Sequence, residues 1–149
     1  MTPSNLSRRV LTDRLALAEE MLAIIRDLPL ETSQRFYADA RNRWTAEACL
    51  RRALEALLDI GRHILAKHFA IGTTEYKAIA HQLQEQNVLT QEEAHLLRIM
   101  AGYRNRMVHF YHELTEEEIY EICRDDLQDI ERMLAAYRRW IGKNAQLNL

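Results

Sequence analysis

The chain of 149 residues, with a mass of 17.5 kDa, has the length of one domain and leaves no room for a second hydrophobic core. Apolar residues make up 48% and charged residues 28%, which excludes a disordered chain, and four glycines with two prolines argue against a turn-rich β-sandwich or barrel. The net charge of −2 argues against a generic basic coat for nucleic acid. We therefore expect a single domain over residues 1–149.

Apolar residues at spacings of three and four predict two long helices in the first half of the chain. Pro29 ends the first, whose apolar positions are Leu11, Leu15, Ala18, Leu22 and Ile25. The second has its apolar positions at Leu50, Leu54, Leu57, Gly61 and Ile64. It could begin as early as Thr32, but a single helix from there would be unusually long, so we expect a break near Asp39–Asn42.

Three further helices are predicted in the second half. A short one fits Glu75–Glu85. Thr90–Glu93 and Thr115–Glu118 are capping boxes, in which hydroxyl and carboxylate satisfy free backbone N–H groups, and the first of them opens a helix to about His109. The second opens a helix with an unbroken stripe at Tyr120, Cys123, Leu127, Ile130, Leu134, Tyr137 and Ile141. The pattern predicts an all-α, antiparallel helical bundle of about five helices, in which the last stripe is core or a seam with a second subunit.

Targeting and redox signals are few. No stretch approaches the roughly 20 apolar residues of a membrane span, and the first residues lack the apolar region of a secretory signal peptide. Cys49 and Cys123 lie far apart and form no CxxC motif. We expect a cytoplasmic protein with no membrane contact and two reduced, buried thiols.

The charges are unevenly distributed. Residues 98–112 contain three arginines, two histidines and no acid, whereas residues 113–131 contain nine acids and one arginine. Arginine outnumbers lysine seventeen to three, so most cations carry the planar fork that suits carboxylate or phosphate. Most of these charges are expected on solvated helix faces, and the 98–112 segment is the exception.

A metal centre is not expected, although six histidines are present. Glu92–His95 is a single E-x-x-H motif, and a di-iron carboxylate bundle needs two. His109 and His112 stand three residues apart, unlike the zinc-protease spacing of four. The glycines are too scattered for a phosphate-binding loop, and no serine lies in a nucleophile elbow. We predict no metal and no cofactor.

The segment from Arg104 to Tyr111 contains the parts that RNA cleavage without a metal requires. Arginine suits a phosphate, and histidine, with a pKa near roughly 6.5, suits proton transfer. On a continuous helix Arg104 and His109 would lie some 140° apart, because each residue turns about 100°. Their convergence on one phosphate needs a helix end near His109, or a cleft shared with a second subunit. From spacing alone, ordinary polar residues near a helix C-terminus are the favoured interpretation.

Arg104-x4-His109-x-Tyr111 resembles the R-x4-H-x-Y motif of HEPN-domain ribonuclease toxins of the HepT type. The segment Asp59–Ile64, DIGRHI, is similar to the DIxxHI segment of that family. Tyr76–Ala80 and Gln86–Leu89 resemble its short connecting helix and the following turn. The resemblance extends over residues 6–140, nearly the whole chain.

The resemblance implies a five-helix bundle, a homodimer that builds a composite cleft from both motif helices, and metal-independent endoribonuclease activity on RNA. It places the chain in a type VII toxin–antitoxin system. The implied partner is a nucleotidyltransferase antitoxin of the MntA type, which transfers AMP to the motif tyrosine, here Tyr111.

Roles follow from the resemblance and from the side chains. Arg104 is expected to bind the scissile phosphate and His109 to act as general acid or base. Asn105, one turn before His109, is a candidate to orient it. Arg106 is a second phosphate contact or a solvent-facing ion pair.

Other residues and functions stay open at this point. Asp59 and His63, one turn apart on the long helix, are a buried polar pair across the bundle or a support beneath the site. The alternative functions are a non-catalytic HEPN module that binds a nucleotide or a partner protein, and a metal-binding helical bundle.

Overall fold

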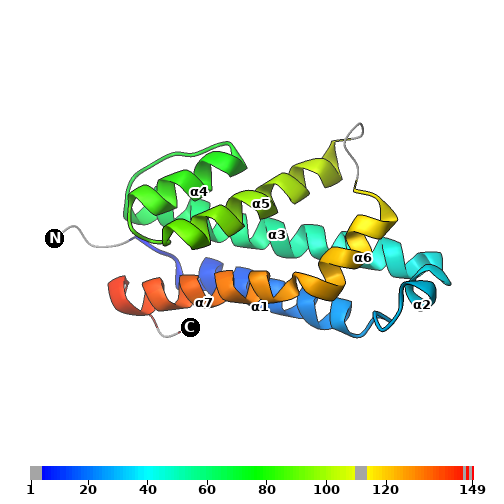
Figure 1. Cartoon of the computed structure of the whole chain (residues 1–149). Helices are drawn as coiled ribbons and strands as arrows, with labels where there is room; N and C mark the ends of the chain where they lie inside the picture. Colours follow the sequence, from blue (N-terminus) through cyan, green and yellow to red (C-terminus); the bar gives the residue numbers. More distant parts are fainter. Residues whose placement is uncertain (1–4, 110–113, 146, 148) are drawn as a thin grey trace.

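The computed structural model describes residues 5–109, 114–145, 147 and 149. Over these residues the chain is helical and forms no strand (Figure 1). The helices are α1 (Arg8–Arg26), α2 (Ser33–Tyr37), α3 (Ala40–His68), α4 (Tyr76–Glu85), α5 (Gln91–Val108), α6 (Glu116–Asp125) and α7 (Leu127–Asn144). The predicted all-α, antiparallel bundle is confirmed.

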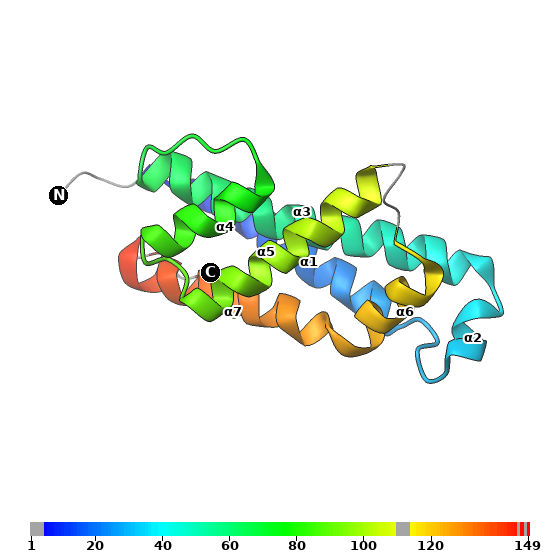
Figure 2. The same cartoon turned by 45° about the horizontal axis from the view of Figure 1, so that its top comes forward.

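The long helix α3 is the centre of the bundle. It packs against each of the other six described helices, with α1 antiparallel along its length (Figures 1 and 2). Its buried side chains, such as Leu50, Leu57 and Ile64, follow the predicted apolar stripe. Tyr137 of α7 is fully buried against it, and the Tyr137 hydroxyl donates to the Leu57 carbonyl at 2.8 Å. The polar tip of this core residue is therefore satisfied.

Local capping sets most of the helix boundaries. Asp39 caps α3, where its carboxylate accepts from the Arg41 N–H at 2.9 Å, and this is the break that the sequence predicts before the long helix. Thr90 and Thr115 form the two predicted capping boxes with Glu93 and Glu118. These boundaries are set by side chains within a few residues, which explains why the sequence alone reveals them.

The last helix differs from the prediction of one continuous element. The chain breaks at Asp126, with φ −111° and ψ 3°, so that α6 and α7 are separate helices. At the break α6 turns over the end of α3, and the hydroxyl of its buried Tyr120 donates to the Leu30 carbonyl at 2.9 Å. The break at Asp126 inserts no extra residue, so the apolar positions of α6 and α7 keep their spacings of three and four across it. This split, together with the short α2, gives seven described helices rather than about five.

Both cysteines are buried and unbonded, as predicted. Burial raises the pKa of the Cys123 thiol to about 12, and it also raises the pKa of Cys49. Neither thiol is a nucleophile at neutral pH. Among the described helices, none combines the length and the apolar character that crossing a bilayer requires.

Gly61 marks a close approach of α3 to α4 and α7. A Cβ atom there would meet Leu83 Cδ1 at 2.8 Å and the Ile79 Cγ2 and Tyr137 Oη atoms at 2.9 Å. We expect Gly61→Ala to lower the free energy of unfolding by about 1–3 kcal/mol, because the core must shift to accept the methyl group. The matched control is Gly142→Ala, an exposed position in α7 with no atom within 4 Å.

Chemical denaturation of both variants checks this prediction. Gly142→Ala should leave stability unchanged or raise it by up to about 1 kcal/mol through helix propensity. A Gly61→Ala protein as stable as the wild type would contradict the tight packing of α3 on α4 and α7.

Candidate functional site

The end of α5 carries both predicted catalytic residues, Arg104 and His109. The helix ends at Val108, and His109 has an extended backbone with φ −99° and ψ 112°. The His109 N–H donates to the Asn105 carbonyl at 3.1 Å, and the His109 side chain is exposed. The helix end that convergence of Arg104 and His109 requires is therefore present. Tyr111, the predicted modification site, lies outside the described residues.

Arg104 is fixed by two other helices. Its Nε atom lies 3.5 Å from Oε1 of Glu55 on α3, and its guanidinium lies 4.5 Å from the ring centroid of Tyr76 on α4. Only 24% of the Arg104 side chain is exposed. A carboxylate and an aromatic ring thus orient this cation before any substrate binds.

The two predicted supporting residues have different surroundings. Asn105 lies beside Arg104, whose Nη1 donates to the Asn105 side-chain oxygen at 3.4 Å. A role for the Asn105 side chain in orienting the His109 ring stays a prediction. Arg106 makes the solvent-facing ion pair, with two hydrogen bonds of 2.8 and 2.9 Å to Glu118 on α6. These bonds hold the pKa of Glu118 below its usual range, and they neutralise part of the positive segment.

Asp59 and His63 do not pair with each other. Asp59 lies 3.5 Å from Arg14 of α1 and 3.9 Å from Arg62, and burial raises the pKa of Asp59 against the pull of those two cations. His63 Nε2 accepts the Ser7 N–H at 3.0 Å, at the start of α1. Each residue contacts the α1 side of the bundle separately.

Three contact residues were not predicted from the sequence: Glu55, Arg62 and Tyr76. Arg62 of α3 places its guanidinium 4.9 Å from the centroid of the same Tyr76 ring that Arg104 covers. One signal for these contacts was present in the sequence. Glu55 and Asp59 are four residues apart, which puts two carboxylates on one face of the predicted helix. It does not identify which cations of other helices meet them.

Around these side chains lies an open pocket of about 400 Å³. Its lining residues are Arg62, Thr74, Glu75, Tyr76, Lys77, Arg104 and Asn105. Three of them are cations and one is a carboxylate, so the pocket favours an anion.

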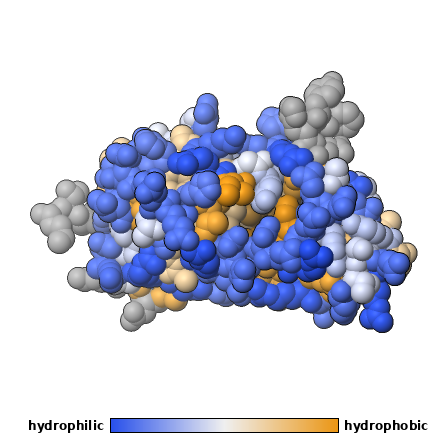
Figure 3. All heavy atoms as spheres, viewed as in Figure 1, coloured by the Kyte–Doolittle hydropathy of each residue, from blue (hydrophilic) through white to orange (hydrophobic). Residues whose placement is uncertain are grey.

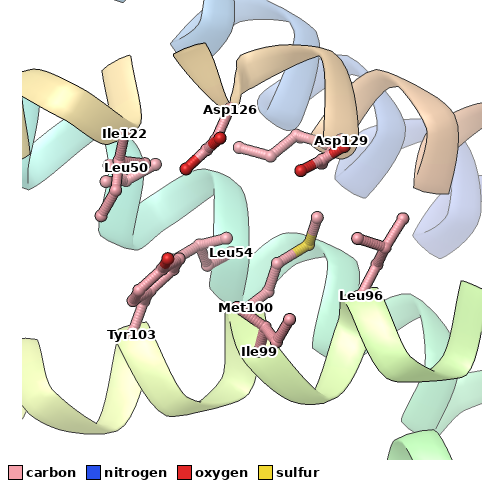
Figure 4. Close-up of a pocket in the computed structure, with 10 residues that line it drawn as sticks. Leu50, Leu54, Leu96, Ile99, Met100, Tyr103, Ile122, Asp126 and Asp129 are labelled. Atoms are coloured by element: carbon pink, nitrogen blue, oxygen red, sulfur yellow. The ribbon is translucent and has the colours of Figure 1, made fainter. Parts of the chain in front are cut away.

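A second pocket, of about 200 Å³, has the opposite character. It lies between α3, α5, α6 and α7, with apolar walls that include Leu54, Ile99 and Met100 (Figure 4). The carboxylates of Asp126 and Asp129 point into it, and burial raises the pKa of Asp126, with Asp129 adding to the effect. Figure 3 shows apolar side chains gathered on this face. Phosphate would be repelled here, so the Arg104 pocket is the better anion site.

Comparison with known proteins identifies the family. Residues 18–137 match the family model described as Ribonuclease HepT-like. The chain belongs to the HepT-like ribonuclease family. No curated protein matches this HepT-like chain.

Solved structures share the HepT-like fold. The tri-AMPylated HEPN toxin of Shewanella oneidensis, in complex with MNT antitoxin, superposes with a TM-score of 0.80 at 23% identity, covering 89% of this chain and 99% of that one. YutE of Bacillus subtilis, a cytosolic protein of unknown function, has a TM-score of 0.78 at 16% identity, with 98% and 96% covered. A Thermus thermophilus protein has a TM-score of 0.60 at 24% identity, with 85% and 97% covered. At these identities the likeness is one of fold.

Metal ligands do not gather in the described part of this HepT-like chain. Among its residues, no three histidine, cysteine or acidic side chains lie where they would hold a metal ion. His95 of the E-x-x-H motif is exposed on α5. The anion pocket is thus the feature of the described residues that best fits a functional site.

His63 gives the fold a testable pH dependence. Burial lowers the pKa of His63, and Lys67 adds to the effect, so the folded state favours the neutral ring that accepts the Ser7 N–H. Because the folded pKa lies below the unfolded value near roughly 6.5, stability is unaffected above that pH and falls as the pH drops through it. We expect His63→Gln to show a shallower loss of stability between about pH 7 and 5. Thermal melts of both proteins across that range test this, and parallel curves would contradict it.

Proposed function

We propose that this HepT-like protein is a metal-independent endoribonuclease and the toxin of a type VII toxin–antitoxin system. The observation that carries the proposal is Arg104, oriented by Glu55 and Tyr76 in a basic pocket five residues before the exposed His109. Family membership supports the same reaction class. The substrate is RNA, because the 2′-hydroxyl supplies an internal nucleophile that DNA lacks.

The chemistry needs a base, an acid and a fixed cation. A neutral His109 removes the 2′-OH proton while the 2′-oxygen attacks phosphorus, and the bond to the 5′-oxygen breaks as that oxygen takes up a proton. The products are a 2′,3′-cyclic phosphate and a 5′-hydroxyl. Arg104 stabilises the charge that develops on the phosphoryl oxygens.

A homodimer would provide both the base and the acid for the two proton transfers at one phosphate. One His109 serves as base and the His109 of a second copy serves as acid, which a single chain with one motif cannot do alone. Val108, an apolar side chain in the last turn of α5, is 40% exposed and offers a contact for such pairing. The positive segments of two copies would then face one cleft.

The partner that we propose is a nucleotidyltransferase antitoxin. The Shewanella neighbour is described as tri-AMPylated and bound to MNT antitoxin, which supports this choice. Transfer of AMP to Tyr111 would break the bond between the α- and β-phosphates of ATP and release pyrophosphate. The attached phosphate would pair with Arg104, and the adenosine would exclude RNA.

Cleavage of RNA tests the catalytic assignment. We expect the purified protein, dimeric by light scattering, to cleave total RNA in the presence of EDTA. His109→Ala and Arg104→Ala should each lower the rate by at least about 100-fold, as expected for loss of a general acid–base group or of the cation at phosphorus. Circular dichroism should show both variants folded.

The control is His95→Ala, an exposed histidine at the other end of α5, which should cleave at the wild-type rate. Full activity of a folded His109→Ala protein would overturn the assignment. Absence of cleavage by the wild type would favour a non-catalytic HEPN module, and stoichiometric bound metal would favour a metal-binding bundle.

Co-expression with the cognate nucleotidyltransferase tests the modification. We expect peptides that contain Tyr111 to gain one or more AMP groups, measured by mass spectrometry. Tyr111→Phe should stay toxic and escape neutralisation, because it lacks the hydroxyl that attacks ATP. Silencing of this variant as complete as that of the wild type would show that inhibition works by binding alone.

A further inference from the structure

Two arginines from different helices share one aromatic ring at the candidate site. Arg62 of α3 and Arg104 of α5 lie 4.9 and 4.5 Å from the centroid of Tyr76, which opens α4. Two like charges held against one ring repel each other. Asp59 and Glu55 lie beside them on α3 and offset part of this cost.

The two guanidinium groups are positioned but poorly satisfied. Arg62 Nη1 lies 3.9 Å from Asp59 and its Nη2 lies 3.5 Å from the Thr74 carbonyl, while the contacts of Arg104 are 3.4 and 3.5 Å. The Nε atoms of both arginines are buried without a hydrogen-bond partner. By contrast, Arg106 makes bonds of 2.8 and 2.9 Å to Glu118. Because the Nε atoms of Arg62 and Arg104 are buried, the donors left for an anion are the Nη groups, whose nearest partners lie at 3.4 Å or more.

The pocket beside these groups adds a third cation. Lys77 follows Tyr76 on α4, is exposed, and lines the same 400 Å³ space as Arg62 and Arg104. Glu75 supplies the one carboxylate in that lining. The pocket extends from Arg104 toward α4. When one phosphate of a nucleic-acid strand lies on Arg104, the adjacent phosphate can therefore lie in the part of the pocket near α4.

We propose that Arg62 and Lys77 bind a second phosphate of the RNA, adjacent to the scissile phosphate on Arg104. Tyr76 is a positioning residue, because its ring supports both guanidinium groups. This inference rests on the proposed function, and it makes the substrate an oligonucleotide that contacts α4 as well as α5. Arg62 is thereby a binding residue that lies outside the R-x4-H-x-Y motif.

Salt-dependent RNA binding tests the second phosphate site without any need for turnover. The background is His109→Ala, and the probe is a short, fluorescein-labelled, single-stranded RNA titrated at several salt concentrations. Each phosphate contact contributes about 0.7 to the slope of log K against log salt for a single strand. We expect Arg62→Gln and Lys77→Gln each to weaken binding several-fold and to reduce the slope by up to that amount.

Arg52→Gln is the matched control. Arg52 is an exposed arginine of the same helix, and it donates to the Ala48 carbonyl at 3.3 Å. Arg52→Gln changes the net charge by the same amount as Arg62→Gln or Lys77→Gln. Because Arg52 does not line the pocket, its substitution should leave the slope of log K against log salt unchanged. Lys77 is exposed, so Lys77→Gln reports on the site even if Arg62→Gln unfolds the protein.

Tyr76 is tested by two substitutions. Tyr76→Phe keeps a ring under the guanidinium groups and should bind RNA as the background does, whereas Tyr76→Leu should weaken binding. Equal slopes for the background, Arg62→Gln and Lys77→Gln would overturn the second phosphate site, while RNA cleavage by the wild-type protein would still support the proposed function. Absence of both RNA binding and cleavage in the wild type would overturn both.

Discussion

The carboxylates along one edge of α3 determine where the cations of its neighbours lie. Glu55 and Asp59 are one turn apart and only about a third exposed, with values of 28% and 33%. A largely buried carboxylate needs a cationic partner. Glu55 contacts Arg104 of α5 as well as Arg51 of its own helix, and Asp59 contacts Arg14 of α1 and Arg62. The central helix thus combines an apolar face that builds the core with an acidic edge that positions the anion pocket.

The geometry of the site also depends on where α5 stops. A continuous helix would turn His109 away from Arg104, and the extended backbone at His109 removes that restriction. The chain resumes helical structure at the capping box of Thr115, and α6 then returns Glu118 to Arg106. This ion pair joins α5 and α6, the described helices on either side of residues 110–113. It also makes Arg104, rather than Arg106, the arginine of this segment that lines the anion pocket.

The sequence predicts what depends on near neighbours in the chain. Apolar spacing and caps such as Thr90 located the helices, and the resemblance of Arg104-x4-His109 to a known motif is the basis of the predicted site. The break at Asp126 was not predictable, because the apolar spacing continues through it and only the packing of α6 on α3 requires a turn. The contacts of Tyr76 were missed because they join three helices, and no spacing within one helix encodes such a meeting.

The net charge of −2 is consistent with an anion site, because charge acts locally in this chain. Ionic interactions fall off over roughly 8–10 Å in physiological salt. Many of the acids in 113–131 are paired close by, as Glu118 is with Arg106, Asp125 with Arg124, and Glu131 with Arg26. The negative charges of these acids are offset by those partners. The pocket of Arg62, Lys77 and Arg104 therefore stays positive. Under the proposed function, recognition of RNA would rest on a few phosphates in this pocket rather than on a general affinity for nucleic acid.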